Sequence, residues 1–421
     1  MRKKFVNLCE KFPPRPFPPE KKRAQKIHKL PIWGVDKRKK TCYNKERLTE
    51  AKIFGVWHSL VVRLVRDQEV ASSNLVTPTS LSSHNGSYGY FFFILLLYSA
   101  AFCRRNTGRN ERTDRFMKTL LFDTDIGADC DDAAALALLF HLQKAGACRL
   151  AAVTASSGRV GATATIRALS DHYGVPVPIG AMRAPYPACD AWDHYARRTM
   201  ERYGTRDTDT DAVSLMRQVL AAASEPVTLV AVGPLTNMAR LLSSAPDGIS
   251  PLSGRALVEQ HADCLYFMGG SFTENYKTVG WEETAPRPSW NIVQDIPAAQ
   301  AVAAGCPVEM VYVPYEAGYY LPTHMEEGDS PVWFAMACFA GDTAPACPPA
   351  EFTRPSWDPL TAYAAVGDLS PYFDLSPRGR VVIDEAGATR FTPGAGRDRF
   401  LGNRACYTEI APRLRALIAG R

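Results

Sequence analysis

From Met117 onward the sequence alternates between short apolar runs and longer helical runs, and this alternation limits the possible fold more than any other feature. The runs with the length and apolar character of strands are residues 120–125, 149–155, 175–180, 227–233, 264–270 and 308–314. The runs with helical patterns are residues 131–144, 162–173, 211–223, 235–242, 296–304 and 331–340. Strands that alternate with helices are typical of a mostly parallel sheet flanked by helices. The sequence therefore predicts one open α/β domain of Rossmann-like type over residues 117–421.

Residues 1–116 differ from the rest in both charge and pattern. They contain 24 Lys and Arg against nine Asp and Glu, whereas residues 117–421 contain 25 against 34. The uncharged apolar run at residues 88–103 is shorter than the roughly 20 residues of a bilayer-spanning helix and lies too far along the chain for a signal peptide. Residues 55–80 resemble the conceptual translation of a transfer-RNA gene. We therefore expect a non-globular extension from a mis-assigned start codon, with a working protein that begins at Met117; a real basic, membrane-associated extension is the alternative.

The distribution of charge and cysteine restricts the partners and the compartment. The basic excess lies outside the patterned part of the chain, so it does not predict binding of nucleic acid or of a membrane. The 11 cysteines are scattered, without a CxxC pair or a His/Cys cluster at zinc spacing. Scattered cysteines of this kind indicate reduced thiols. We expect a cytoplasmic protein with no nucleic-acid or membrane partner.

An acidic turn follows the first strand-like run. It contains five carboxylates within ten residues: Asp123, Asp125, Asp129, Asp131 and Asp132. A turn between a strand and a helix lies at the carboxyl end of a parallel sheet, where α/β proteins bind ligands. Helix capping by aspartate explains one or two of the five. Crowded carboxylates repel one another unless a cation intervenes, and their hard oxygens favour calcium or magnesium. The turn therefore predicts a divalent-metal site, with a merely acidic loop as the alternative.

Four later segments also place polar or glycine residues beside strand ends or helix starts. They are residues 230–242 with Gly233-Pro234, residues 267–270 with two glycines, residues 289–299 with Trp290 and Asn291, and residues 356–364 with Asp358. Taken singly, each is as well explained by a tight turn or a helix start.

Taken together and in order, however, these segments resemble the nucleoside hydrolase family over residues 117–410. The motifs that carry the resemblance are DTD and DDA, then GPLTN, MGG, WNI followed by D and AA, and finally WDPL. The resemblance implies calcium-dependent hydrolysis of the N-glycosidic bond of ribonucleosides or related N-ribosides, by a homodimer or homotetramer. It implies that calcium is held by Asp125, Asp132, the backbone carbonyl of Val232, and Asp358.

The same resemblance assigns roles toward the substrate. Asp125 would be the general base that takes a proton from the attacking water. The residues implied or suspected to contact the riboside are Asp131, Asn275, Trp290, Asn291 and Trp357. Such carboxylates suit this chemistry because cleavage passes through an oxocarbenium-like state that negative charge stabilises.

Three departures from the family pattern bear on these roles. The acidic turn is two residues longer, so Asp129 could displace one of the assigned ligands. Trp357 stands where purine-active members carry a His that protonates the base, and Ser289 stands where many members carry a Glu that contacts ribose. His194 and His324 are other candidate proton donors, although solvent-exposed histidines are the simpler interpretation.

Two other hypotheses stay open. One is a catalytically weak riboside-binding protein on the same fold. The other is a phosphatase of the haloacid dehalogenase type, because residues 122–127 resemble its nucleophile loop; Gly127, and the context of Asp358, count against it.

Overall fold

A mostly parallel sheet forms the centre of the fold, as the alternating pattern predicts. The computed structural model describes residues 117–183, 193–272 and 288–421. The strands are β1 (Lys118–Thr124), β2 (Cys148–Ala155), β3 (Ile179–Gly180), β4 (Val227–Ala231), β5 (Ala262–Met268), β6 (Glu309–Val313), β7 (Pro322–Thr323), β8 (Arg354–Pro355), β9 (Phe373–Leu375), β10 (Gly379–Ile383), β11 (Thr389–Pro393) and β12 (Asp398–Asn403). The described residues fall in one compact unit, Phe116–Arg421.

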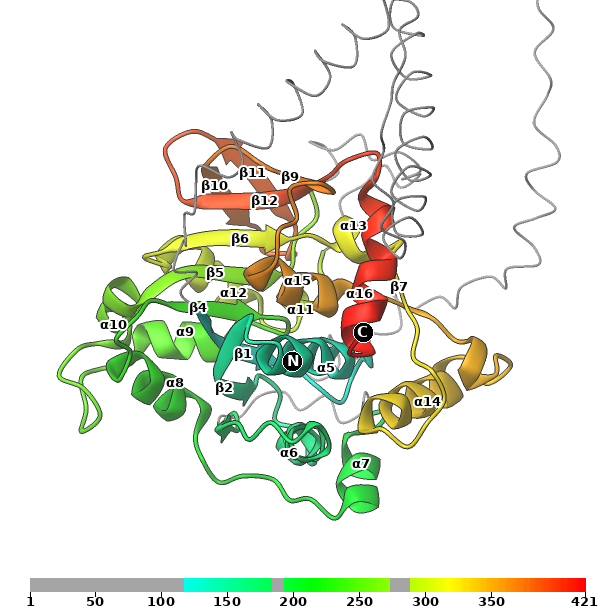
Figure 1. The fold of residues 1–421 in the computed structure, drawn as a ribbon. Coiled ribbons are helices and arrows are strands. Elements are labelled where there is room, and N and C mark those ends of the chain that lie inside the picture. Colours follow the sequence, from blue (N-terminus) through cyan, green and yellow to red (C-terminus); the bar gives the residue numbers. More distant parts are fainter. Residues whose placement is uncertain (1–116, 184–192, 273–287) are drawn as a thin grey trace, which may run out of the picture. The chain divides into compact units, whose positions relative to one another are not determined.

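The strand order places β1 at the point where the chain changes direction across the sheet. The order is β11-β10-β12-β6-β5-β4-β1-β2-β3, with β9 paired to β12 (Figure 1). Every neighbouring pair from β12 to β3 in this order is parallel. The chain builds β2 and β3 on one side of β1 and then β4, β5 and β6 on the other. A crevice at the carboxyl ends of β1 and β4 is therefore the expected ligand position in such a sheet.

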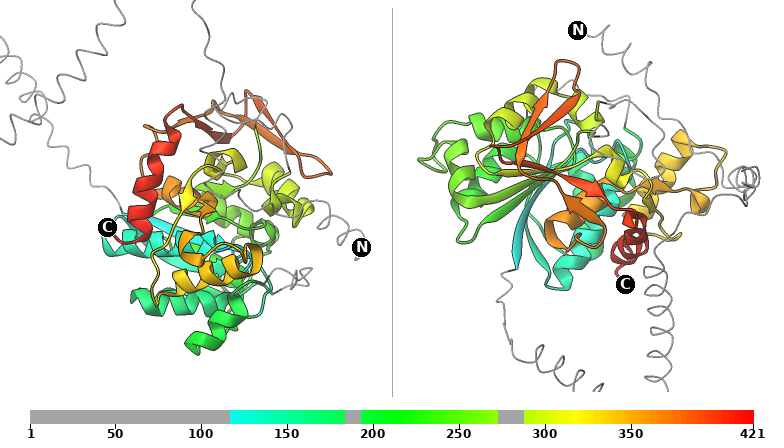
Figure 2. Two further views of the ribbon diagram at one scale, coloured as in Figure 1. Left: turned by 90° about the vertical axis from the view of Figure 1, so that its right-hand side faces the viewer. Right: turned by 90° about the horizontal axis from the view of Figure 1, so that it is seen from above.

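Helices cover both faces of the sheet (Figure 2). The first face carries α5 (Asp131–Lys144), α6 (Ala162–Tyr173), α14 (Pro331–Thr343), α15 (Trp357–Val366) and α16 (Ala411–Ile418). The second carries α8 (Ala212–Ala221), α9 (Thr236–Ser243), α10 (Gly254–His261) and α12 (Ile296–Gly305). The shorter elements are α7 (Ala196–Tyr203), α11 (Trp290–Val293), α13 (Tyr315–Gly318) and the 3-10 helices η3 (Pro349–Glu351) and η4 (Tyr407–Ile410).

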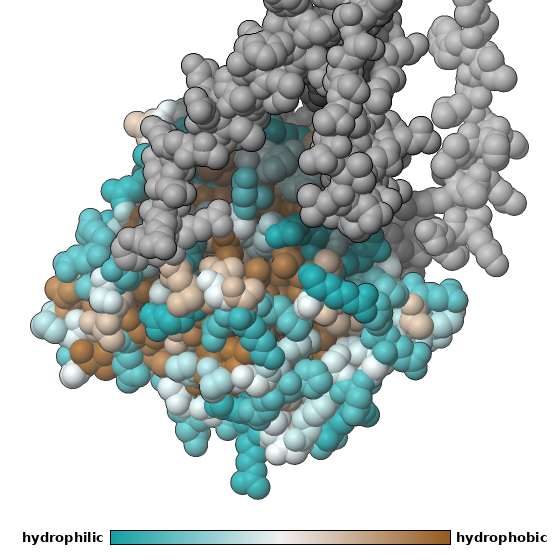
Figure 3. All heavy atoms as spheres, viewed as in Figure 1, coloured by the Kyte–Doolittle hydropathy of each residue, from teal (hydrophilic) through white to brown (hydrophobic). Residues whose placement is uncertain are grey.

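Two apolar cores lie on the two faces of the sheet. Along β1, Leu120 and Phe122 belong to the core of the first face, while Leu121 belongs to that of the second. This division follows from the strand's geometry, because successive side chains point to opposite faces. On the side seen in Figure 3, hydrophilic side chains cover much of the outer surface of the described residues, with apolar residues visible between them. In the described part of the chain, no helix is long and apolar enough to cross a membrane.

Some elements differ from the prediction. Helices α5 and α6 have the predicted bounds, but β3 is only two residues long where six were predicted. Pro176 and Pro178 lack the backbone N–H that a ladder needs, which accounts for the shorter strand. The antiparallel strands β9 to β12 were not predicted, although residues 379–383 alternate between buried and exposed side chains. Residues 1–116 lie outside the described residues, so the predicted boundary at Met117 stays a prediction.

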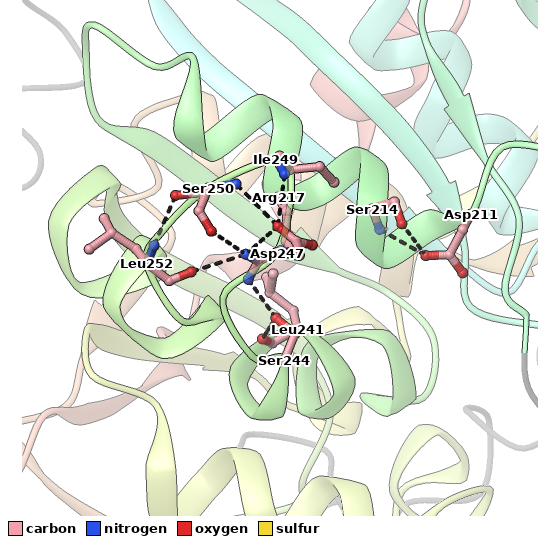
Figure 4. A network of polar contacts seen from close by, with 9 residues as sticks. All are labelled: Asp211, Ser214, Arg217, Leu241, Ser244, Asp247, Ile249, Ser250 and Leu252. Atoms are coloured by element: carbon pink, nitrogen blue, oxygen red, sulfur yellow. Dashed lines mark hydrogen bonds and ion pairs between the residues drawn. The ribbon is translucent and has the colours of Figure 1, made fainter.

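A buried arginine holds the second face together (Figure 4). Arg217 of α8 donates two hydrogen bonds to the carboxylate of Asp247, at 2.9 and 2.8 Å, and one to Ser244 Oγ at 2.8 Å. It also donates to the backbone carbonyls of Ser250 and Leu252. The guanidinium thus connects α8 to the loop between α9 and α10.

Candidate functional site

The acidic turn leaves the sheet at the crevice between β1 and β4. Just beyond the strands, the amide of Val232 donates to the Asp123 carbonyl at 2.8 Å, and the amide of Ser156 donates to the Thr124 carbonyl at 2.8 Å. These bonds hold the carboxyl ends of β1, β2 and β4 level with one another. Side chains that follow each strand therefore meet at one edge of the sheet.

Two helices begin at this edge and bring three carboxylates together. Asp131 and Asp132 are the first two residues of α5, and Asp358 is the second residue of α15. One oxygen from each lies within 4.8 Å of the other two. The amide of Asp358 donates to Asp131 Oδ2 at 3.0 Å, which joins the two helix starts. The positive ends of both helix dipoles also favour negative charge here.

The cluster has the electrostatic character of a cation site. Burial raises the pKa values of Asp131, Asp132 and Asp358 well above their ordinary range, and the neighbouring carboxylates raise them further. Thr124 Oγ1 donates to Asp132 Oδ1, but Oδ2 of Asp132 is buried without a hydrogen-bond partner among the described residues. A buried carboxylate oxygen of this kind needs either a proton or a cation as its partner. Three hard oxygen donors on a rigid frame fit a divalent cation.

Asp125 is not one of the three carboxylates whose oxygens lie within 4.8 Å of one another in the described residues, but among the neighbouring charges its own contributes most to the raised pKa of Asp132. The carboxylate of Asp125 accepts a hydrogen bond from Gln294 Nε2 at 3.0 Å, and its backbone carbonyl accepts one from Arg159 Nη1 at 2.8 Å. Burial raises the pKa of Asp125, while the charge of Arg159 and the Gln294 hydrogen bond act in the opposite direction. The structure therefore brings Asp131, Asp132 and Asp358 together, where the predicted carboxylate ligands were Asp125, Asp132 and Asp358.

Asp129, which lies in the longer acidic turn, forms an ion pair with Arg354. Arg354 Nε donates to both carboxylate oxygens of Asp129, at 2.9 and 3.0 Å, and Arg354 Nη2 donates to Oδ2. Asp129 Oδ1 also accepts a bond from the amide of Cys130. Both Asp129 oxygens thus have partners, and Asp129 is not one of the three clustered carboxylates of the described residues.

Val232 and Asn291 lie against each other in the crevice. Asn291 Nδ2 donates to the Val232 carbonyl at 2.7 Å and to the Met268 carbonyl at 3.0 Å. A carbonyl oxygen has two lone pairs, so the Val232 carbonyl retains one for another partner. Asn291 is buried, whereas the neighbouring Trp290 is 40% exposed. The predicted contact residue Asn275 lies outside the described residues.

Aromatic side chains form a wall beside Asp358. Trp357 stacks on Tyr315 with ring centroids 5.2 Å apart, and its Nε1 donates to the Tyr315 carbonyl at 2.9 Å. Tyr319 lies 5.2 Å from Tyr315, again between ring centroids. Gly318 lets Trp357 approach α13, because a Cβ on Gly318 would stand 2.5 Å from the Trp357 ring. This wall is partly exposed and offers apolar ring surface next to the carboxylates.

His194 has a different environment from the one predicted. Its Nδ1 lies 3.1 Å from Asp342 Oδ2, and its ring contacts Phe339 edge-on. Only 14% of its side chain is exposed, so it is not the solvated surface histidine that the simpler interpretation described. The His194 amide donates to the Gly127 carbonyl at 3.0 Å, which places this residue beside the acidic turn. His324 follows β7 and is half-buried.

Comparison with known proteins decides the family. The family model described as inosine-uridine preferring nucleoside hydrolase matches residues 120–390. The chain belongs to this nucleoside hydrolase family. The predicted resemblance and the predicted fold class are therefore both confirmed.

Individual relatives have modest sequence identity to this chain. The non-specific ribonucleoside hydrolase RihC of Escherichia coli is 31% identical over 194 residues, which are 44% of this chain and 57% of the relative. The chain thus matches little more than half the length of that relative.

Solved structures share its fold at low identity. The inosine-uridine preferring nucleoside hydrolase of Bacillus anthracis is 18% identical with a TM-score of 0.51, over 72% of this chain and 100% of that one. The type III effector protein XopQ, solved in complex with adenosine diphosphate ribose, is 19% identical with a TM-score of 0.52, over 73% and 93%. At such identity these structures support the fold alone.

Proposed function

We propose that this protein hydrolyses the N-glycosidic bond of ribonucleosides or closely related N-ribosides with the help of a bound calcium ion. The observation that carries the proposal is the convergence of Asp131, Asp132 and Asp358 at the switch point of a nucleoside hydrolase fold. A mixed set of carboxylate and carbonyl oxygens suits calcium, whose coordination geometry is flexible, better than magnesium, which requires a strict octahedron. Asp132, Asp358 and the Val232 carbonyl would hold the ion, with Asp125 or Asp131 as the further carboxylate.

Asp125 is proposed to be the general base. Its Oδ2 accepts a hydrogen bond from Gln294, which fixes the orientation of the carboxylate for proton transfer from water. When bound, a calcium ion supplies Lewis acidity that eases this deprotonation. The burial that raises the pKa of Asp125 also suits a base, because proton transfer is most effective when the pKa approaches the working pH.

The sugar and the base are proposed to occupy opposite sides of the cluster. Asp131 and Asn291 are candidates to bind ribose hydroxyls, with Asn275 and Trp290 as further contacts predicted from the sequence. The buried carboxylates stabilise positive charge on the ring during cleavage. The aromatic wall of Trp357, Tyr315 and Tyr319 offers ring surface against which a flat base can pack. The indole N–H of Trp357 is too weakly acidic to protonate a base nitrogen as His does, and it is donated to the Tyr315 carbonyl. We therefore expect little discrimination in favour of purines.

A riboside-binding protein with slow turnover is the second candidate. Trp357 and Ser289 replace residues that other members use toward the base and the ribose, which favours this alternative. The complex of the structural neighbour XopQ with adenosine diphosphate ribose is consistent with a riboside ligand. The family match argues against the phosphatase hypothesis. The cytoplasmic location and the homodimer or homotetramer implied by the resemblance stay predictions.

Ribose release and calcium binding test the proposal together. We would compare the wild-type protein with Asp132→Asn, and use Asp374→Asn as a control on an exposed carboxylate. Calcium binding is followed by titration calorimetry, and free ribose by a reducing-sugar assay on purine and pyrimidine nucleosides. We expect wild type and the control to bind calcium and release ribose, and Asp132→Asn to lose both. Calcium binding without ribose release would favour the binding protein, and a wild type that binds no calcium would overturn the metal assignment.

A further inference from the structure

An ion pair joins the two chain segments that supply the carboxylate cluster. Asp129 lies two residues before Asp131, and Arg354 lies four residues before Asp358, yet the paired residues are 225 positions apart in sequence. The side chains of Arg354 and Asp129 are only 18% and 27% exposed, so solvent screens this pair less than an ordinary surface pair.

Both partners are held from several directions. The Asp129 backbone carbonyl accepts a hydrogen bond from Tyr195 Oη at 2.6 Å. The guanidinium of Arg354 lies over the ring of Phe339 at 4.9 Å and over that of Trp357 at 5.1 Å, measured from Cζ to the ring centroid. A planar guanidinium that is packed against rings and engages both oxygens of a carboxylate has little freedom to rotate. The pair therefore fixes both the distance and the angle between the two segments.

The segment between Arg354 and Asp358 transmits this constraint. Arg354 pairs with Thr323 in the short β7–β8 ladder, and the amide of Ser356 donates to the Leu321 carbonyl at 2.7 Å. Helix α15 then starts at Trp357. The chain from Arg354 to Asp358 thus has its backbone held at each step, so a shift of Arg354 displaces Asp358 relative to Asp131.

We propose that Asp129 and Arg354 form a positioning pair that holds Asp358 at coordination distance from Asp131 and Asp132. This inference rests on the proposed calcium site for its function. The pair acts through the carboxylates that it positions. It gives a purpose to the longer acidic turn of this chain, since the turn carries Asp129 to Arg354.

A charge effect and a positioning effect both predict weaker calcium binding for Asp129→Asn, but they predict opposite results for Arg354→Met. If the pair acted only through its charges, Asp129→Asn would weaken calcium binding and Arg354→Met would strengthen it, because the second change removes a positive charge near the ion. If the pair acts by positioning, both variants weaken calcium binding. Losses of supporting residues around metal sites are typically about 10- to 100-fold in affinity.

The experiment measures calcium affinity by titration calorimetry on the full chain. The variants are Asp129→Asn, Arg354→Met and Arg354→Lys, and the control is Arg404→Met, which removes an exposed ion pair with Asp374. We expect affinity to fall about 10- to 100-fold in the first three and to stay unchanged in the control. Arg354→Lys keeps the charge without the planar fork, so it separates the two explanations even if Arg354→Met does not fold.

Hydrogen–deuterium exchange gives a readout that needs no metal. The amide of Asp358 donates to Asp131 Oδ2, so its exchange reports whether the two segments stay together. We expect faster exchange of this amide in calcium-free Asp129→Asn and Arg354→Lys, but not in the control. Opposite shifts in calcium affinity for Asp129→Asn and Arg354→Met, or unchanged affinity and exchange in all variants, would overturn the inference. A wild type without calcium binding would instead overturn the proposed metal, and the exchange data would still decide on the pair.

Discussion

Asp123, near the end of β1, allows a quantitative test of how burial changes the pKa of a carboxylate in this protein. Its carboxylate is fully buried, and Oδ1 accepts hydrogen bonds from Thr154 Oγ1 at 2.6 Å and Asn237 Nδ2 at 2.9 Å. In the described structure Oδ2 has no hydrogen-bond partner. Burial raises the pKa of Asp123 from 3.8 to about 7, against the effect of its two hydrogen bonds. The folded protein therefore keeps a proton that the unfolded chain releases.

The sign and the size of the effect follow from this shift. Because the folded state binds more protons than the unfolded state, the free energy of unfolding decreases as pH rises from about 4 to about 7 and then levels off. At about 1.4 kcal/mol per pKa unit, the full effect is about 4 kcal/mol, of which about 2.5 kcal/mol falls between pH 5 and pH 8. Asp123→Asn keeps an acceptor oxygen and cannot ionise. We expect its stability relative to wild type to increase by about 2.5 kcal/mol from pH 5 to pH 8.

The assay is urea unfolding of both proteins at pH 5, 6.5 and 8, with a chelator present so that no divalent ion competes for the neighbouring carboxylates. Asp374→Asn, which removes an exposed carboxylate, serves as the control and should follow wild type at every pH. A difference between wild type and Asp123→Asn that stays constant across this range would refute the reasoning, since it would mean that Asp123 does not change protonation there.

Three other predictions concern the ion, the fold and the proposed base. Calcium should raise the melting temperature more at pH 8 than at pH 6, because burial raises the pKa values of the clustered carboxylates and protons compete with the ion. The shift is measured at each pH by melting the protein with calcium and with a chelator, and equal shifts at the two pH values would contradict this prediction. Arg217→Met should lower the free energy of unfolding by about 2–4 kcal/mol in urea titrations, whereas exposed Arg404→Met should leave it nearly unchanged. Gln294→Leu should lower kcat about tenfold with little change in KM in ribose-release kinetics, because Asp125 loses the bond that orients it; a change confined to KM would speak against that role.

The sequence predicted the helices whose ends are marked by residues next to them in the chain. The bounds of α5 and α6 follow from helical runs that are bordered by the acidic turn and by glycines on either side. The paired strands β10 and β11 escaped prediction, although Val381 and Ile383 face the core while Arg380 and Val382 are exposed. Such short alternating runs are weak evidence without knowledge of the strand they pair with.

The residues that support the site could not be found in the same way. Asp131 and Asp132 were recognisable because crowded carboxylates are visible within a few positions of one another. Gln294 is 169 positions from Asp125, and Arg354 is 225 from Asp129, so neither forms a local motif with the residue it supports. Only the fold reveals that these amide and guanidinium groups face the acidic turn.

The separation of Asp131 from Asp358 has a consequence for how the protein is made. These residues touch through a hydrogen bond, but they are 227 positions apart in the sequence. At roughly 5–20 residues per second, a ribosome needs on the order of ten seconds or more to cover that interval. Throughout this time the nascent acidic turn exists without its α15 partner. The ion-binding arrangement therefore cannot form on the growing chain until most of the sheet has been synthesised, which makes capture of the ion a late event in maturation.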